Sequence, residues 1–181
     1  RLRGWLALLL CALALSGQAR PVSRAIWMWE EDSYALLEHP QQAADALRFL
    51  QRKGIQTLYL YADAHHGRLL LRSHPGHYAR LIRQLHQGGI RVHALLGSWP
   101  LHTERYVLPE YRAEALAMLQ RVIDYNLAAE PEARFDGVNL DIEPHVLDAW
   151  PAQRERLLKG FIELSEAFMA LKRRANVALQ M

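Results

Sequence analysis

The strict alternation of short apolar runs with longer segments of helical periodicity is the feature that most constrains the fold of this chain. The apolar runs are rich in β-branched and aromatic residues, as buried strands are. They are 25–29, Thr57–Tyr61, Arg91–Leu96, 135–142 and a run that begins near Asn176. Alternation of strand and helix predicts an α/β fold with a parallel sheet and right-handed crossovers.

The turn after the first strand decides between an open sheet and a barrel. Open nucleotide-binding sheets usually carry a glycine-rich phosphate turn at this point. Here the chain runs through Trp29, Glu30, Glu31 and Asp32, an acidic stretch without glycine that would repel phosphate. A barrel is therefore favoured, and its closure takes about eight strands. We expect a (β/α)8 TIM-barrel type of α/β fold, truncated after about five βα units, with residues 20–181 as the N-terminal part of the barrel domain.

Residues 1–19 have the pattern of a signal peptide. Arg1 and Arg3 precede an apolar run, 5–15, and the small residues Gly17 and Ala19 follow it. The run is too short to span a bilayer, which takes about 20 apolar residues. We therefore predict cleavage before Arg20, a secreted or periplasmic location, and no stable membrane insertion afterwards.

Charge and side-chain chemistry exclude several classes of partner. Two of the arginines behind the formal net charge of +3 lie in 1–19, so nothing in the mature chain indicates nucleic-acid binding. Its single cysteine, Cys11, also lies there, so no disulfide is needed. Asp63, His65 and His66 follow the second strand, but adjacent histidines point to opposite sides and no further ligand is suitably spaced. We expect no metal and no other cofactor.

The stretch 135–145, FDGVNLDIEPH, carries the strongest chemical signal. Alternation across a strand places Asn139, Asp141 and Glu143 together on the face opposite the apolar side chains. Inward polar groups are costly to bury unless they are paired or wet. Enzymes built on barrels keep their sites at the carboxyl ends of the strands. The end of the fourth strand is therefore the candidate site.

The spacing of Asp141 and Glu143 suits acid–base chemistry. Two residues apart on one face, their Cα atoms lie roughly 6.6–7 Å apart. Two carboxylates this close disfavour joint ionisation, so one is expected to stay protonated near neutral pH. We expect Glu143, nearer the rim, to present this proton to a leaving oxygen, and Asp141 to keep the charge. The alternative is an acidic strand end paired with Arg or Lys from a neighbouring loop.

The segment 136–143 resembles the fourth-strand signature of glycoside hydrolase family 18, the chitinase-like barrels, which is Asp-Gly-x-Asp-x-Asp-x-Glu. Asp136, Gly137, Asp141 and Glu143 match this signature. Asn139 stands where the family has its middle Asp.

A weaker match lies at 95–99, LLGSW, which resembles the family's third-strand Ser-x-Gly-Gly segment with departures at Leu95 and Ser98. The dipeptide Glu143-Pro144 is also similar to the Asn-Glu-Pro strand end of another group of retaining glycosidases, although Ile142 stands in place of the Asn.

The family-18 resemblance implies retaining hydrolysis assisted by the substrate, with Asp136, Asn139, Asp141 and Glu143 as the catalytic motif. Glu143 would protonate the glycosidic oxygen, and Asp141 would orient the acetamido group that acts as nucleophile. Asn139 can only form hydrogen bonds where the middle Asp shares a proton, so the pH profile should shift. The implied substrate is a secreted or envelope polysaccharide or oligosaccharide, possibly with N-acetylated sugars. The alternative is a chitinase-like protein that binds carbohydrate without cleaving it.

Four further residues are candidates for substrate binding: Trp29, Tyr61, Trp99 and His145. Aromatic faces stack on sugar rings, and the three aromatic residues lie near strand ends. Core packing for the aromatic residues and a solvated loop for His145 are the alternatives. Glu30 and Asp32 could bind sugar hydroxyls or could simply be solvated.

Overall fold

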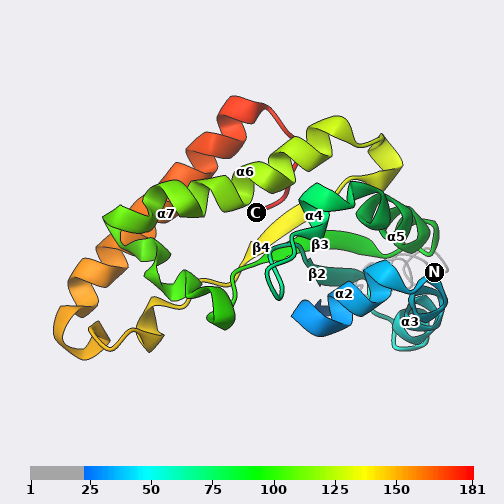
Figure 1. The fold of residues 1–181 in the computed structure, drawn as a ribbon, viewed down its shortest axis with the longest axis horizontal. Coiled ribbons are helices and arrows are strands. Elements are labelled where there is room, and N and C mark those ends of the chain that lie inside the picture. Colours follow the sequence, from blue (N-terminus) through cyan, green and yellow to red (C-terminus); the bar gives the residue numbers. More distant parts are fainter. Residues whose placement is uncertain (1–22) are drawn as a thin grey trace, which may run out of the picture.

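The computed structural model describes residues 23–181, and the predicted signal peptide and the predicted start at Arg20 lie outside this range. Its centre is a parallel sheet with the strand order β1-β2-β3-β4, flanked by helices (Figure 1). The strands are β1 (Ala25–Met28), β2 (Thr57–Tyr61), β3 (Arg91–Leu96) and β4 (Gly137–Leu140). The predicted α/β alternation is confirmed through the fourth strand.

The run expected as a fifth strand forms only one bridge to β4 within the described residues. Gly137 forms a single parallel bridge with Gln180. The amide of Val138 donates to the Gln180 carbonyl over 2.7 Å, and the amide of Gln180 donates to the Asp136 carbonyl over 3.0 Å. The free side of β4 is thus where the next segment of chain pairs.

Helices fill each connection between the strands. They are α2 (Glu30–Glu38) and α3 (Pro40–Arg52) after β1, α4 (Leu70–Ser73) and α5 (Pro75–Gln87) after β2, α6 (Arg112–Ala128) after β3, and α7 (Trp150–Ala175) after β4. Short 3-10 helices are η1 (Trp99–Leu101), η2 (Thr103–Val107), η3 (Pro109–Tyr111), η4 (Pro131–Ala133) and η5 (Pro144–Val146).

Helix α2 is the main departure from the sequence prediction, which placed an acidic turn there. Its first turn contains Glu30, Glu31 and Asp32. Carboxylates at this end of a helix interact favourably with the helix dipole. The acidic run that argued against phosphate binding therefore also begins a helix, which places Glu30 directly after β1.

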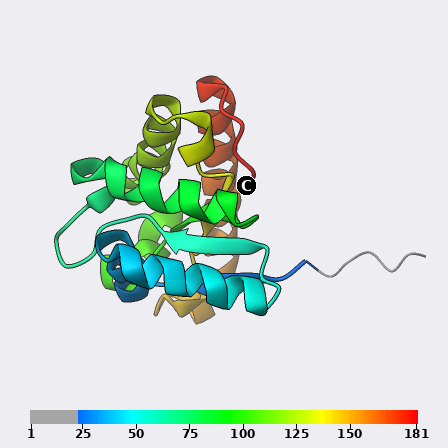
Figure 2. The same cartoon turned by 90° about the vertical axis from the view of Figure 1, so that its right-hand side faces the viewer.

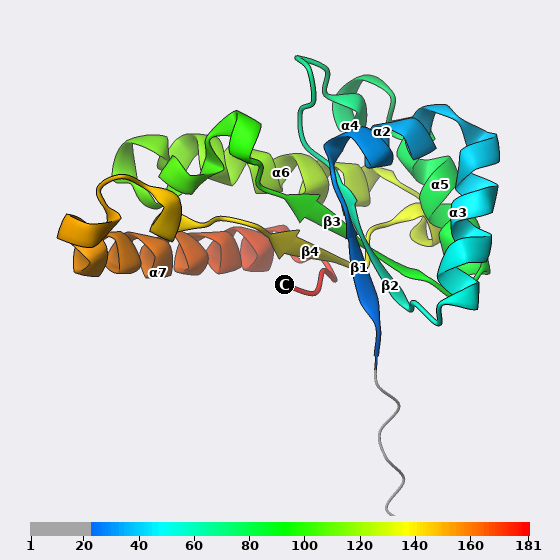
Figure 3. The ribbon, with the colours of Figure 1, turned by 90° about the horizontal axis from the view of Figure 1, so that it is seen from below.

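The two faces of the sheet differ in what covers them. Leu58, Leu60, Val92 and Ala94 have no exposed surface, because they point toward the helices. Helices α3 and α5 pack against each other on this side (Figures 1 and 2). The opposite face carries Trp27, which is 52% exposed, and Figure 3 shows β1 and β2 with no helix in front of them. One face of the sheet is therefore open.

The amino end of β4 is held by Asp136. Its Oδ2 accepts hydrogen bonds from the amide of Val92 over 2.7 Å and from Nε2 of His86 over 2.9 Å. His86 reaches from α5, and its Nδ1 lies 2.9 Å from the Glu132 carbonyl oxygen. Asp136 thus joins β4 to β3 and α5 at the end of the strand opposite Glu143, so its assignment as a catalytic residue is corrected to a structural one.

The helices of the described range include no segment both long enough and apolar enough to cross a membrane.

Candidate functional site

A cavity of about 360 Å³ opens at the carboxyl ends of β1, β3 and β4. Its lining combines carboxylates with exposed aromatic side chains. The lining residues are Trp29, Glu30, Trp99, Pro100, Thr103, Glu104, Asp141, Glu143 and Val146. The sequence prediction of a site at the end of the fourth strand therefore coincides with a cavity.

Gly97 brings the end of β3 against Asp141, at the end of β4. The Asp141 amide donates to the Leu96 carbonyl over 2.7 Å, which extends the pairing of β3 and β4 by one step. Gly97 has φ +108°, and a Cβ at this position would lie 2.1 Å from the Asp141 carbonyl oxygen. Only glycine fits here, because it tolerates positive φ and has no side chain.

Ser98 connects this turn to the first strand. Its hydroxyl donates a short hydrogen bond to Oε1 of Glu30, and its amide donates to Oγ1 of Thr103 over 2.8 Å. Ser98 and Thr103 are both buried. The Glu30 carboxyl group, which lines the cavity, is thereby held in place by the turn that follows β3.

Asp141 and Glu143 lie in different environments. Burial raises the pKa of Asp141, and the neighbouring carboxylates of Glu143 and Glu30 raise it further. The side chain of Glu143 is 54% exposed. The sequence argument expected Asp141 to keep its charge, whereas in the structure Asp141 is the carboxyl group whose pKa is raised, because it is buried and has like charges beside it.

Glu104 is a cavity residue that sequence reasoning missed. Its side chain is only 8% exposed, and the basic side chains nearest to its Oε1 are His102, through Nδ1 at 3.4 Å, and Arg105, through Nε at 3.6 Å. It lies in η2, within a stretch that resembles a loop and has no periodicity. The only available signal was its position in the segment that follows the third strand.

Two of the predicted aromatic contacts lie at the cavity. Trp29 is 42% exposed and Trp99 is 65% exposed, and both line it. His145 lies just outside, with its Nε2 3.9 Å from Oε1 of Glu143. A solvated sugar ring could stack on either indole, because apolar ring faces prefer contact with an aromatic surface.

Two other predicted site residues lie elsewhere. Tyr61 has no exposed surface, and its hydroxyl donates to the Ala64 carbonyl over 2.9 Å, so its assignment as a substrate contact is corrected to a structural one. Asn139 lies on the open face, where its Oδ1 accepts a hydrogen bond of 3.3 Å from Nε1 of Trp27. Asn139 is outside the cavity lining and is fixed by an indole rather than by a carboxylate.

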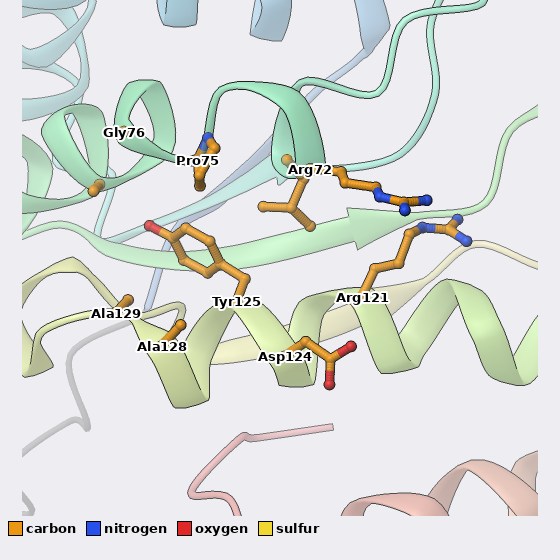
Figure 4. A pocket seen from close by; sticks show the side chains of 10 residues that line it. Arg72, Pro75, Gly76, Arg121, Asp124, Tyr125, Ala128 and Ala129 are labelled. Atoms are coloured by element: carbon orange, nitrogen blue, oxygen red, sulfur yellow. The ribbon is translucent and has the colours of Figure 1, made fainter.

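A larger cavity, of about 620 Å³, lies between the α4–α5 corner and α6. Figure 4 shows Arg72 and Arg121 at one end of it and Tyr125, Ala128 and Ala129 toward the other. The Arg121 guanidinium is engaged with buried Asp63, over 2.6 Å from Nη2 to Oδ1. No predicted site residue lines this cavity. We take the smaller cavity as the candidate site, because it holds the carboxylates at the strand ends.

Within residues 23–181 no three His, Cys, Asp or Glu side chains are placed to hold a metal ion together. Comparison with protein-family models, with curated proteins and with solved structures found no match for this chain.

Proposed function

We propose that this protein is a glycoside hydrolase that cleaves a secreted or envelope polysaccharide by acid catalysis from Glu143. The observation that carries the proposal is the meeting of Asp141 and Glu143 with two exposed indoles, Trp29 and Trp99, in one cavity. Paired carboxylates supply the acid chemistry that glycoside hydrolysis needs. Aromatic walls supply a surface on which sugar rings stack.

The proposed architecture is the first half of a (β/α)8 barrel of the family-18 type. The parallel order β1-β2-β3-β4, with helices on one face, is the order that such a barrel requires. The bridge from Gly137 to Gln180 lies where the next barrel strand would pair. The open face with Trp27 and Asn139 would then line the barrel interior.

The proposed mechanism divides the work between the two carboxyl groups. Glu143 lies exposed at the rim, where it can reach a glycosidic oxygen. Because its pKa is raised, Asp141 holds a proton to higher pH than an isolated carboxyl group does. Glu143 takes up the proton of Asp141 and donates it to the leaving oxygen as the glycosidic bond breaks. The ionised Asp141 then stabilises the positive charge that develops on the substrate.

The charge of the cavity restricts the substrate class. Four acidic side chains line it, Glu30, Glu104, Asp141 and Glu143, and the lining includes neither Lys nor Arg. Anionic polysaccharides would be repelled from such a cavity. Neutral and amino-substituted sugars are therefore the expected substrates, including those with N-acetyl groups.

Carbohydrate binding without cleavage is the second candidate function. Asn139 favours it, because this side chain takes the place of the middle Asp of the resembled motif and is hydrogen-bonded to Trp27. An amide cannot pass a proton along the strand. Retention of Glu143 at an exposed position argues for cleavage.

Glu143→Gln tests the proposal in the full-length protein. The amide keeps the shape of the side chain but cannot transfer a proton, so turnover of a natural oligosaccharide should fall by about 10² or more. Binding of the same oligosaccharide, measured by calorimetry, should change little. An activated aryl glycoside, whose leaving group needs no protonation, should recover much of the lost rate.

Glu110→Gln is the matched control, because Glu110 is exposed in η3 and does not line the cavity. Turnover of the Glu143→Gln variant within about threefold of the parent would exclude Glu143 as the general acid. Oligosaccharide binding without any cleavage by the parent protein would establish the second candidate function instead.

A further inference from the structure

We propose that Glu30 is a positioning residue of this site, which keeps one proton within the Asp141–Glu143 pair. The inference rests on the proposed function and adds a third carboxylate to it. Glu30 comes from the start of α2 rather than from β4. It acts through Asp141, and no contact between Glu30 and the reacting atoms is required.

The geometry fixes the Glu30 carboxylate beside the pair. Glu30 lines the same cavity as Asp141 and Glu143. The hydroxyl of buried Ser98 donates to its Oε1, and Ser98 follows Gly97, whose backbone lies against the Asp141 carbonyl. Ser98 and Gly97 are adjacent in the chain, so the hydrogen bond to Glu30 and the close approach to the Asp141 backbone come from the same turn after β3.

The hydrogen bond from the Ser98 hydroxyl holds the Glu30 carboxyl group at the cavity. A fixed negative charge beside a second, buried carboxyl group raises the cost of ionising that group. Consistent with this, burial, Glu143 and Glu30 in that order raise the pKa of Asp141. Glu30 is the only one of these causes that lies outside the β4 segment.

The other charged groups around the cavity do not cancel this effect. Glu104 adds a further negative charge to the lining, with His102 and Arg105 beside it. His145 lies on the Glu143 side, 3.9 Å from that carboxylate. No cation is interposed among the lining residues themselves, so the like charges of the cavity act on Asp141 directly.

The position of Asn139 shows why a third carboxylate from elsewhere is useful. Along β4 the neighbour of Asp141 on the same face is an amide, held by Trp27 on the open face. The strand itself therefore supplies two carboxyl groups to the cavity. Glu30 supplies a third carboxyl group to the cavity from the start of α2, which follows β1.

Glu30→Gln in the full-length protein is the test, with Glu31→Gln as the matched control. Glu31 lies in the same first turn of α2, so it has the same relation to the helix dipole, but it is exposed and does not line the cavity. Glu30→Asp restores a carboxylate at the position. Circular dichroism and thermal unfolding establish that each variant is folded before it is compared.

Two measurements are made on each folded variant. The first is the titration of the Asp141 side-chain carboxyl by carbon NMR, which needs no substrate. The second is the pH dependence of kcat/KM with an oligosaccharide. Removal of a like charge stabilises the ionised form of Asp141, so both the titration and the alkaline limb should move to lower pH by about 0.5–1 unit in Glu30→Gln. Glu31→Gln should match the parent in both measurements. Glu30→Asp, which restores a carboxyl group, should bring both back most of the way to the parental values.

An unchanged Asp141 titration in folded Glu30→Gln overturns the inference, whatever the protein cleaves. A shifted titration with an unchanged pH–rate profile shows electrostatic contact without a role in turnover, and this also overturns it. If no oligosaccharide is cleaved by the parent, the proposed function fails, while the titration still decides whether Glu30 holds the proton on Asp141.

Discussion

Replacing Gly97 by alanine should damage both the stability and the chemistry of this protein. The new Cβ would lie 2.1 Å from the Asp141 carbonyl oxygen, and the carbonyl carbon lies only 2.7 Å from it. These are backbone atoms at the end of the β3–β4 pairing, so no side-chain rotation can relieve the overlap. The two strands must separate locally, which moves Asp141 within the cavity.

The magnitude follows from two separate costs. A non-glycine residue at φ +108° carries backbone strain of about 1–3 kcal/mol. Forcing an extra methyl group into closely packed atoms costs about 1–3 kcal/mol more. We therefore expect the free energy of unfolding to fall by about 2–6 kcal/mol, as the sum of the two ranges. Urea denaturation followed by circular dichroism measures it.

Gly89→Ala separates the two costs. Gly89 also has positive φ, +77°, but a Cβ there meets nothing within 4 Å. This control should therefore show the strain without the overlap, and it should leave turnover unchanged. If Gly97→Ala and Gly89→Ala are destabilised equally, within about 0.5 kcal/mol, and both keep parental turnover, the close approach of β3 to Asp141 has no energetic consequence and the reasoning is refuted.

Two further predictions concern ion pairs outside the cavity. Asp63→Ala should lower the free energy of unfolding by about 3 kcal/mol in urea denaturation, because it leaves the partly buried Arg121 without its partner; a change below about 1 kcal/mol would contradict this. Asp136→Asn should destabilise most between about pH 4 and 6.5, which urea denaturation at several pH values would check. The hydrogen bond to Asp136 raises the pKa of His86 above 6.5, so this contribution is present below pH 6.5 and is lost as the pH rises through the raised value. Burial opposes the ionisation of Asp136, but the bonds from His86 and Val92 outweigh it and lower its pKa below 3.8, so this contribution is lost only as the pH falls through the lowered value. An equal loss at pH 5 and pH 9 would show that the His86 bond does not matter.

The local pattern of the sequence was enough to predict the parallel sheet and the placing of Asp141 and Glu143 at one cavity. Thr57–Tyr61 and Arg91–Leu96 form strands with the predicted bounds. Asp141 and Glu143 lie together at the carboxyl end of the sheet, where alternation along β4 placed them. These features depend on side-chain alternation over a few residues, which can be read from the chain directly.

The same pattern failed where the outcome depended on distant partners. Tyr61 alternates like a site residue, but it is buried and its hydroxyl is taken by Ala64. Asp136 belongs to the same motif as Glu143, but the two residues lie at opposite ends of β4. At its own end, Asp136 accepts hydrogen bonds from His86 and from the amide of Val92. Membership in the motif therefore did not predict whether a side chain lies at the cavity or at the opposite end of the strand.

By itself the sequence determined the order of strands and helices, and it determined that two carboxyl groups share one face at the end of β4, because both depend on residues near in the chain. Only the tertiary structure decided that the pKa of Asp141 is raised and that Glu30 and Glu104 join the cavity. These depend on burial and on charges brought in from α2 and η2, far apart in the chain. The free energy of a charge depends on every group around it in space, and folding sets those neighbours.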